Sequence, residues 1–259
     1  MIKFAIAGTK DFFNGGKRAL EQEGYIPELE IHGEERVIAY KEVIQGKKLE
    51  LLVCLAHPNI LTSDEINLFP KGCINLHTGI PKYCGRHPVN WMIIDELKEI
   101  PVAVHYMTRT IDGGDIIVED SFLRERTDDY NSIMKKITEM SSRLLVSSIK
   151  QIESDSVYRK KQVLPREYPR RRIPEDSKVD WNKTSRELHN FISALVDPLP
   201  NAFAYTTDGE RVIFNRSYVG EEMGKVIATT SDGRYVISTK DGVILIESDK
   251  KLKVGDRFR

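Results

Sequence analysis

Apolar runs and helical repeats alternate along the first two thirds of the chain. Apolar runs at 2–7, 26–31, 49–56 and 74–77 are typical of strands, and the segments up to residue 23 and over 35–45 have helical periodicity. Further along, the pattern predicts a helix over 89–97, strands over 101–108 and 116–122, and the longest helix over 129–154. Strands that alternate with helices indicate an α/β fold, with a mostly parallel sheet covered by helices on both faces.

The pattern changes after about residue 158. Residues 158–178 are dense in Arg, Lys and Pro, which is typical of a connector, and Thr184 and Glu187 have the spacing of a capping box for a helix running to about Val196. Short β-like runs follow, at 203–207, 210–215, 225–230, 235–240 and 242–248, with Asp-Gly turns at 208–209, 232–233 and 241–242. We therefore predict a large domain over 1–165, a connector and helix over 166–200, and a small β-barrel-like domain over 201–259.

Composition narrows the class of protein. The 259 residues include 39 basic and 39 acidic side chains, so the formal net charge is zero and gives no support for a broad nucleic-acid surface. No apolar run approaches the roughly 20 residues that a membrane helix needs, and we expect the first residues to form a buried strand and not a signal peptide. The three cysteines lack a C-x-x-C pair, so we expect them to be reduced and structural and the protein to be cytoplasmic.

Candidate chemistry gathers between residues 74 and 115. Asn75 and His77 are two positions apart, so on a strand their side chains lie on the same face, and they stand at a strand end where α/β sheets bind ligands. Asp112 follows 35 positions after His77, beside two glycines that allow a sharp turn. An amide can stabilise an oxyanion, an imidazole can exchange a proton, and a carboxylate can orient the imidazole. Together they indicate acyl transfer to an amine that supplies its own nucleophile.

Structural roles also fit these residues. A histidine at a strand end and an aspartate in a D-G-G-D turn are both common without any catalytic role. The other histidines are expected to be structural or on the surface; they are His32, His57, His87, His105 and His189. No segment has metal-ligand spacing and the first loop lacks G-x-G-x-x-G, so we predict neither a metal nor a dinucleotide site.

Four ordered motifs resemble the 10-formyltetrahydrofolate-dependent formyltransferases. They are Asn75-Leu-His77, Pro81-Lys-Tyr83-x-Gly85, Pro88-x-x-Trp91 and Asp112-x-Gly114-Asp115-Ile116. The segment 168–181 is similar to the connector of the amino-sugar formyltransferases, and the last residues are similar to the C-terminal domain of this group. The resemblance implies a Rossmann-like formyltransferase domain, followed by a small β-barrel-like (OB-like) domain.

The resemblance also implies roles for individual residues. Asn75, His77 and Asp112 match the family's catalytic Asn, His and Asp. The folate donor is expected against the loops 56–61 and 107–112, where the positions of interest are Asn59, Leu61, Met107 and Arg109.

The acceptor that the resemblance implies is the amino group of a UDP- or dTDP-linked amino deoxysugar, for the biosynthesis of surface glycans such as the O-antigen of lipopolysaccharide. Candidate contacts to its diphosphate are Lys82, Arg86, Arg171 and Arg172. The connector arginines fit equally well a role in joining the two domains. Beside the sugar, the partners expected are folate and a second copy of the chain, with neither nucleic acid nor membrane. The alternatives are methionyl-tRNA as acceptor, hydrolysis of formyl-folate, and a folate-binding pseudoenzyme or interaction module.

Overall fold

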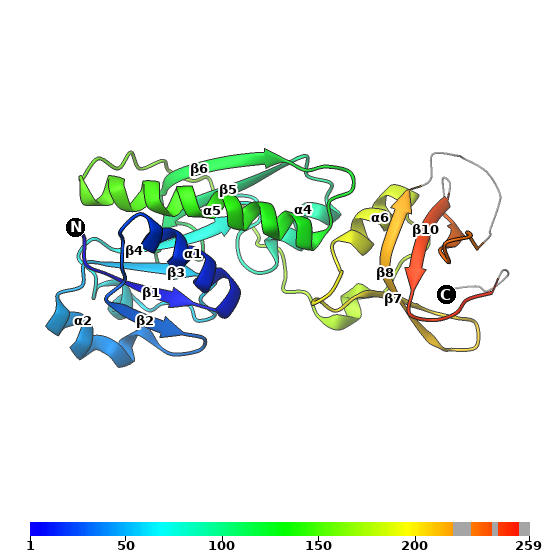
Figure 1. Ribbon diagram of the computed structural model, residues 1–259, viewed down its shortest axis with the longest axis horizontal. Helices are drawn as coiled ribbons and strands as arrows, with labels where there is room; N and C mark the ends of the chain where they lie inside the picture. Colours follow the sequence, from blue (N-terminus) through cyan, green and yellow to red (C-terminus); the bar gives the residue numbers. More distant parts are fainter. Residues whose placement is uncertain (220–228, 240–242, 254–259) are drawn as a thin grey trace. The chain divides into compact units, whose positions relative to one another are not determined.

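The computed structural model describes residues 1–219, 229–239 and 243–253 (Figure 1). By their packing, the residues form two compact units. The first comprises Met1–Pro88, Glu99–Leu123 and Met134–Pro169, and the second comprises Val89–Lys98, Arg124–Ile133 and Arg170–Arg259. Two short segments of the second unit, Val89–Lys98 and Arg124–Ile133, thus come from within the large domain expected over residues 1–165. The domain limits drawn from the sequence remain predictions.

The first unit contains a six-stranded sheet in the order β2-β1-β3-β4-β5-β6. Its strands are β1 (Phe4–Gly8), β2 (Leu29–His32), β3 (Leu51–Leu55), β4 (Cys73–Thr78), β5 (Glu99–Tyr106) and β6 (Ile116–Leu123). Strands β2, β1, β3 and β4 are parallel, as predicted, whereas β5 pairs antiparallel with both β4 and β6. Residues 107–115 join β5 to β6, and they are fewer than the dozen or more that a parallel crossover needs.

Helices cover both faces of this sheet, as the alternating pattern predicted. They are α1 (Lys10–Gln22), η1 (Val37–Tyr40), α2 (Lys41–Lys47), α3 (Ser63–Ile66) and α5 (Tyr130–Glu153), which belongs to this unit from Met134 on. Helix α4 (Pro88–Ile94) lies in the second unit from Val89 on. On one face, Ala5 and Ala7 of β1 belong to a buried cluster with Val37 and Ile44. On the other face, α1 approaches so closely at Gly16 that a Cβ there would lie 2.3 Å from the Leu55 side chain and 3.2 Å from that of Leu145. Helices α1 and α5 therefore pack together over β3 (Figure 1).

The second unit contains an antiparallel sheet in the order β7-β8-β10-β9, formed by β7 (Ala202–Tyr205), β8 (Arg211–Val219), β9 (Tyr235–Ser238) and β10 (Val243–Ser248). Helix α6 (Ser185–Ser193) packs against β8 and β10, and a short helix, η2 (Pro174–Ser177), precedes it. The predicted capping box is confirmed, because Thr184 and Glu187 each bind the other's backbone N–H. Most of the predicted strand 225–230 and the turn at 241–242 lie outside the described residues.

The helices do not meet the length and hydropathy that a bilayer crossing requires. Within the described part of the chain, every helix is too short or too polar to cross a membrane.

Candidate active site

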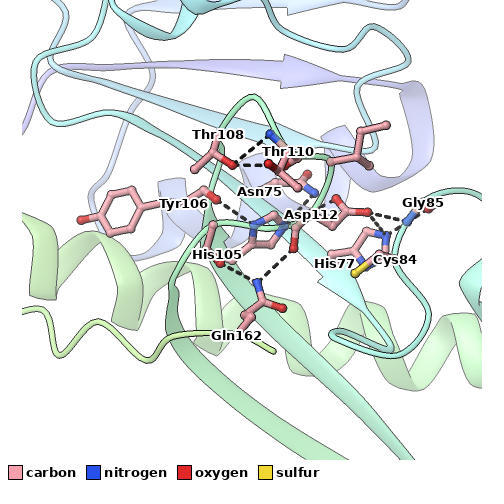
Figure 2. Close-up of polar contacts among 12 residues, drawn as sticks. Asn75, His77, Cys84, Gly85, His105, Tyr106, Thr108, Thr110, Asp112 and Gln162 are labelled. Atoms are coloured by element: carbon pink, nitrogen blue, oxygen red, sulfur yellow. Dashed lines mark hydrogen bonds and ion pairs between the residues drawn. The ribbon is translucent and has the colours of Figure 1, made fainter. Parts of the chain in front are cut away.

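Strand β4 carries two polar side chains that are only half-buried, Asn75 and His77. Along Cys73–Thr78, only Asn75 and His77 are half-buried, and their neighbours are buried. They lie on the same face of the strand, as their spacing predicted. Strand β5 runs beside β4, with His105 opposite Asn75 and Ala103 opposite His77. Figure 2 shows the polar side chains that meet on this face of the sheet.

The loop 107–115 brings Asp112 to the same place. The loop folds back so tightly that a Cβ on Gly114 would lie 1.8 Å from the Tyr106 carbonyl oxygen, so no larger residue fits there. Asp112 itself has a left-handed backbone, with φ of 50°. Its Oδ2 accepts a hydrogen bond from the Gly85 N–H at 2.7 Å and lies 3.2 Å from His77 Nε2. The three residues proposed from the sequence are therefore in one site.

The contacts of His77 define where its proton sits. The Nε2 atom lies 3.2 Å from both Asp112 Oδ2 and the Gly85 carbonyl oxygen, and both of these atoms only accept hydrogen bonds. The Nε2 atom must therefore carry a hydrogen in the neutral as well as the charged ring. The Nδ1 atom is buried and has no hydrogen-bond partner among the described residues. Nδ1 is therefore the ring nitrogen that the described residues leave unbound, while Asp112 places a negative charge beside Nε2.

His105 joins this site, although the sequence suggested only a structural or surface role. It is 1% exposed; its Nδ1 lies 2.9 Å from the Tyr106 carbonyl oxygen, and its Nε2 lies 3.3 Å from Asn75 Nδ2. Burial, together with the positive charge that His77 can carry, lowers the pKa of His105 to about 4. The ring is thus neutral, with its hydrogen on Nδ1, and Nε2 accepts a hydrogen bond from the Asn75 amide. The pairing of His105 with Asn75 depends on the register of β4 against β5, which the sequence pattern of neither strand reveals.

The loops assigned to the folate donor meet beside the site. Leu61 is buried, and Met107 packs against the same apolar cluster. Leu61 also lines a cavity of about 380 Å³ together with the exposed Arg109 and with residues 62–64. The Asn59 amide instead donates to the Glu34 carbonyl oxygen at 2.9 Å. Three of the four positions thus lie together, whereas the Asn59 N–H groups are engaged by the protein.

The residues assigned to the acceptor divide into two groups. Lys82 and Arg86 are exposed on the loop after β4, the loop that carries Gly85. The Arg172 guanidinium lies 5.2 Å from the centre of the Trp91 ring and 5.5 Å from that of Phe191, and it donates to the Asp176 carbonyl oxygen. Arg171 is exposed. Trp91, Phe191 and Asp176 thus hold the Arg172 guanidinium within the second unit, and the roles of the four residues stay predictions.

Cysteines and possible metal ligands do not add to the site. Cys54, Cys73 and Cys84 are buried and unpaired, and burial raises the pKa of the Cys54 and Cys84 thiols to about 12. Over residues 1–219, 229–239 and 243–253, no group of three or more His, Cys, Asp or Glu side chains is placed to hold a metal ion.

Two known family domains match most of the chain. Residues 10–149 match the family described as formyl transferase, and residues 172–253 match the formyl transferase C-terminal domain. The chain belongs to the formyl transferase family. The resemblance noted in the sequence is thereby confirmed, as is the order of a mixed α/β unit and an antiparallel C-terminal unit.

Proteins that resemble this chain carry different names and were solved with different ligands. A methionyl-tRNA formyltransferase from Fusobacterium nucleatum is 31% identical over 243 residues, which is 84% of this chain and 77% of that protein. An N-formyltransferase from Helicobacter canadensis, solved with folinic acid and dTDP-3-aminofucose, has a TM-score of 0.73 at 19% identity and covers 96% of this chain and 100% of its own. HypX from Aquifex aeolicus, solved with tetrahydrofolic acid, has a TM-score of 0.74 at 17% identity. This chain spans 46% of HypX. At these identities the solved structures show the fold alone.

Proposed function

We propose that this protein transfers a formyl group from 10-formyltetrahydrofolate to the amino group of a UDP- or dTDP-linked amino deoxysugar, in the biosynthesis of surface glycans. The observation that carries the proposal is the convergence of Asn75, His77 and Asp112 at β4, in a chain of the formyl transferase family. In this reaction the folate supplies the formyl group, and the chain's residues handle charge and protons.

Asn75 is assigned to the formyl oxygen. A carboxamide has two N–H donors, and His105 Nε2 accepts one of them. This contact orients the amide and leaves the second N–H to donate to the formyl oxygen as negative charge develops there. A donor that is already in place needs no reorganisation during the reaction, which is why such groups lower the barrier.

His77 and Asp112 are assigned to proton transfer. As the amine nitrogen bonds to the formyl carbon, it must lose a proton, and the nitrogen that leaves must gain one. Asp112 Oδ2 lies 3.2 Å from His77 Nε2, so its negative charge stabilises the ring when the ring takes up a proton from the reacting amine. His77 and Asp112 are 12% and 11% exposed, so water screens their interaction only in part.

The residues beside the site fit a folate donor. Leu61 and Met107 provide apolar surface, and Arg109 places a positive charge at the cavity next to Leu61. A pterin ring system needs apolar contact, and the acidic tail of a folate suits an arginine. We assign Leu61, Met107 and Arg109 to the donor. Asn59 would act only through its side-chain oxygen, since its N–H groups face Glu34 and Glu35.

Different observations favour two acceptors, a nucleotide-linked amino sugar and methionyl-tRNA. A tRNA complex held by many phosphates calls for a broad basic surface, and this chain has a net charge of zero. The Helicobacter canadensis enzyme, which was solved with a dTDP-linked sugar, matches this fold nearly from end to end. Methionyl-tRNA is the second candidate, because the Fusobacterium nucleatum relative carries that name. We assign the sugar diphosphate to Lys82 and Arg86, which both lie on the loop after β4.

A side-by-side formylation assay tests the proposal. The protein and formyl donor are incubated with charged initiator tRNA and with a panel of UDP- and dTDP-linked amino sugars, and products are detected by the mass of the added formyl group. We expect transfer to a sugar, with a KM that responds weakly to salt because only two phosphates are bound. Transfer to tRNA alone would refute the sugar assignment and leave formyl transfer intact.

The acceptor contacts can be tested in the same assay. Lys82→Ala and Arg86→Ala should each raise KM for the sugar nucleotide by about tenfold or more and leave KM for the donor unchanged, since a charge-assisted contact contributes roughly 1.5–3 kcal/mol. Lys161→Ala is the matched control, because Lys161 pairs with Asp115 and lies outside the assigned sites. Equal KM values for the sugar in all three variants would contradict the assignment.

A further inference from the structure

A segment far along the chain holds the loop that carries Asp112. The Gln162 Nε2 atom donates to the Asp112 carbonyl oxygen at 3.0 Å and to the Gly114 carbonyl oxygen at 2.5 Å. The Tyr168 hydroxyl donates to the Ile111 carbonyl oxygen at 2.8 Å. Figure 2 shows the Gln162 side chain reaching this loop. Three carbonyl groups within four residues are therefore bound by side chains of the single segment 162–168.

The loop needs such support because of its own sequence. Asp112 has a left-handed backbone, which is unfavourable for a residue with a Cβ unless the surroundings hold it. Gly113 and Gly114 follow it and have no side chains that could pack. The position of the Asp112 carboxylate against His77 and Gly85 depends on this backbone conformation, so whatever fixes the loop also fixes the carboxylate.

The orientation of the Gln162 amide follows from its partners. Both partners are carbonyl oxygens, so the NH₂ end must face them. The opposite end, Oε1, is buried without a hydrogen-bond partner in the part of the chain that the structure describes. The side chain thus serves as a double donor. Its segment is anchored on either side, by the backbone pairing of Lys160 with Ile116 and by the packing of Leu164 and Tyr168 on an apolar cluster.

We propose that Gln162, assisted by Tyr168, is a positioning residue that holds Asp112 in its left-handed conformation and so keeps the carboxylate against His77 and the Gly85 N–H. Gln162 acts through the backbone and does not touch the reacting atoms. Its effect on turnover rests on the proposed function, whereas its effect on the position of Asp112 is a property of the protein without ligands.

The Gly85 amide proton reports the position of the carboxylate directly, because it is donated to Asp112 Oδ2. Its protection against hydrogen exchange, measured by NMR on the ligand-free protein, should fall about tenfold in Gln162→Leu, the scale of one or two lost hydrogen bonds. It should fall further in Gln162→Glu, because carboxylate oxygens would then face two carbonyl oxygens. Gln45→Glu, the same change at an exposed position of α2, is the control and should leave Gly85 protected.

Unchanged protection of Gly85 in both Gln162 variants would overturn the proposal, whatever the substrate. Where either variant fails to fold, Tyr168→Phe removes a single hydroxyl from a half-buried ring and should lower the same protection by a smaller factor. In kinetics, Gln162→Leu should lower kcat about tenfold and leave KM for the donor unchanged. Normal kcat would refute the effect on turnover. Absence of transfer by the unaltered protein would refute the proposed function instead, and the exchange data would still decide the positioning role.

Discussion

The substitution Asp112→Asn isolates the charge of the site from its geometry. Both close contacts of the carboxylate converge on the same atom, since Oδ2 lies 2.7 Å from the Gly85 nitrogen and 3.2 Å from His77 Nε2. An asparagine that places its amide oxygen there keeps both contacts. The negative charge beside His77 is lost, and an amide group replaces Oδ1, which lies 3.7 Å from His105 Nε2.

The expected loss of activity in Asp112→Asn can be worked out from the distance between Asp112 Oδ2 and His77 Nε2. Two unit charges 3.2 Å apart interact by about 5 kcal/mol at an effective dielectric constant near 20, which is an upper bound for a site that water still reaches. A hydrogen bond to a charged group contributes roughly 1.5–3 kcal/mol net, which corresponds to a fall in kcat of about 10- to 200-fold. Asp112→Ala also loses both contacts, so we expect a loss of at least about 10²-fold, as for His77→Ala.

Steady-state formylation kinetics with the acceptor found in the panel measure this effect. The variant should unfold at the same temperature as the unaltered protein and have the same KM for the donor. Asp115→Asn is the matched control: the same change three residues along, at a carboxylate that pairs with Lys161. A kcat of Asp112→Asn within about threefold of the unaltered enzyme would refute the assigned role of the charge.

Three further predictions concern stability and cofactor requirement. The pKa of His105 lies below that of an unfolded histidine, so the unfolded chain binds the extra proton and the free energy of unfolding should fall, by at most about 3 kcal/mol, as pH drops from about 6.5 to about 4. In His105→Gln, the free energy of unfolding measured by chemical denaturation should not show this fall with pH. An equal fall in both proteins would contradict the prediction. Glu65 is fully buried and accepts hydrogen bonds from Arg36 and the Thr62 N–H. Glu65→Ala should therefore lower the free energy of unfolding by about 3–5 kcal/mol in chemical denaturation. A decrease below about 1 kcal/mol would contradict this. Activity should survive chelation, and a loss restored by a divalent ion alone would show a metal requirement.

The two-residue spacing of Asn75 and His77 is enough to place both side chains on one face, because alternation along a strand is a local property. The capping box at Thr184 is equally local, and it correctly marked the start of α6. The Thr62-x-x-Glu65 box has the same signature but begins a helix of only four residues, too short for periodicity to reveal. What the chain's own pattern determined is therefore the order of elements and the family motifs.

Contacts between distant segments were decided only in the tertiary structure. His105 lies opposite Asn75 because of the register of β4 and β5, and a shift of one residue would have turned it to the other face. Gln162 and Tyr168 reach the Asp112 loop after some fifty residues of intervening chain. The sequence offered Arg172 as a contact to a diphosphate or as a link between domains, and only the structure shows that it packs against Trp91 and Phe191. Strand register and side-chain packing depend on which surfaces meet, and no pattern within a single segment carries that information.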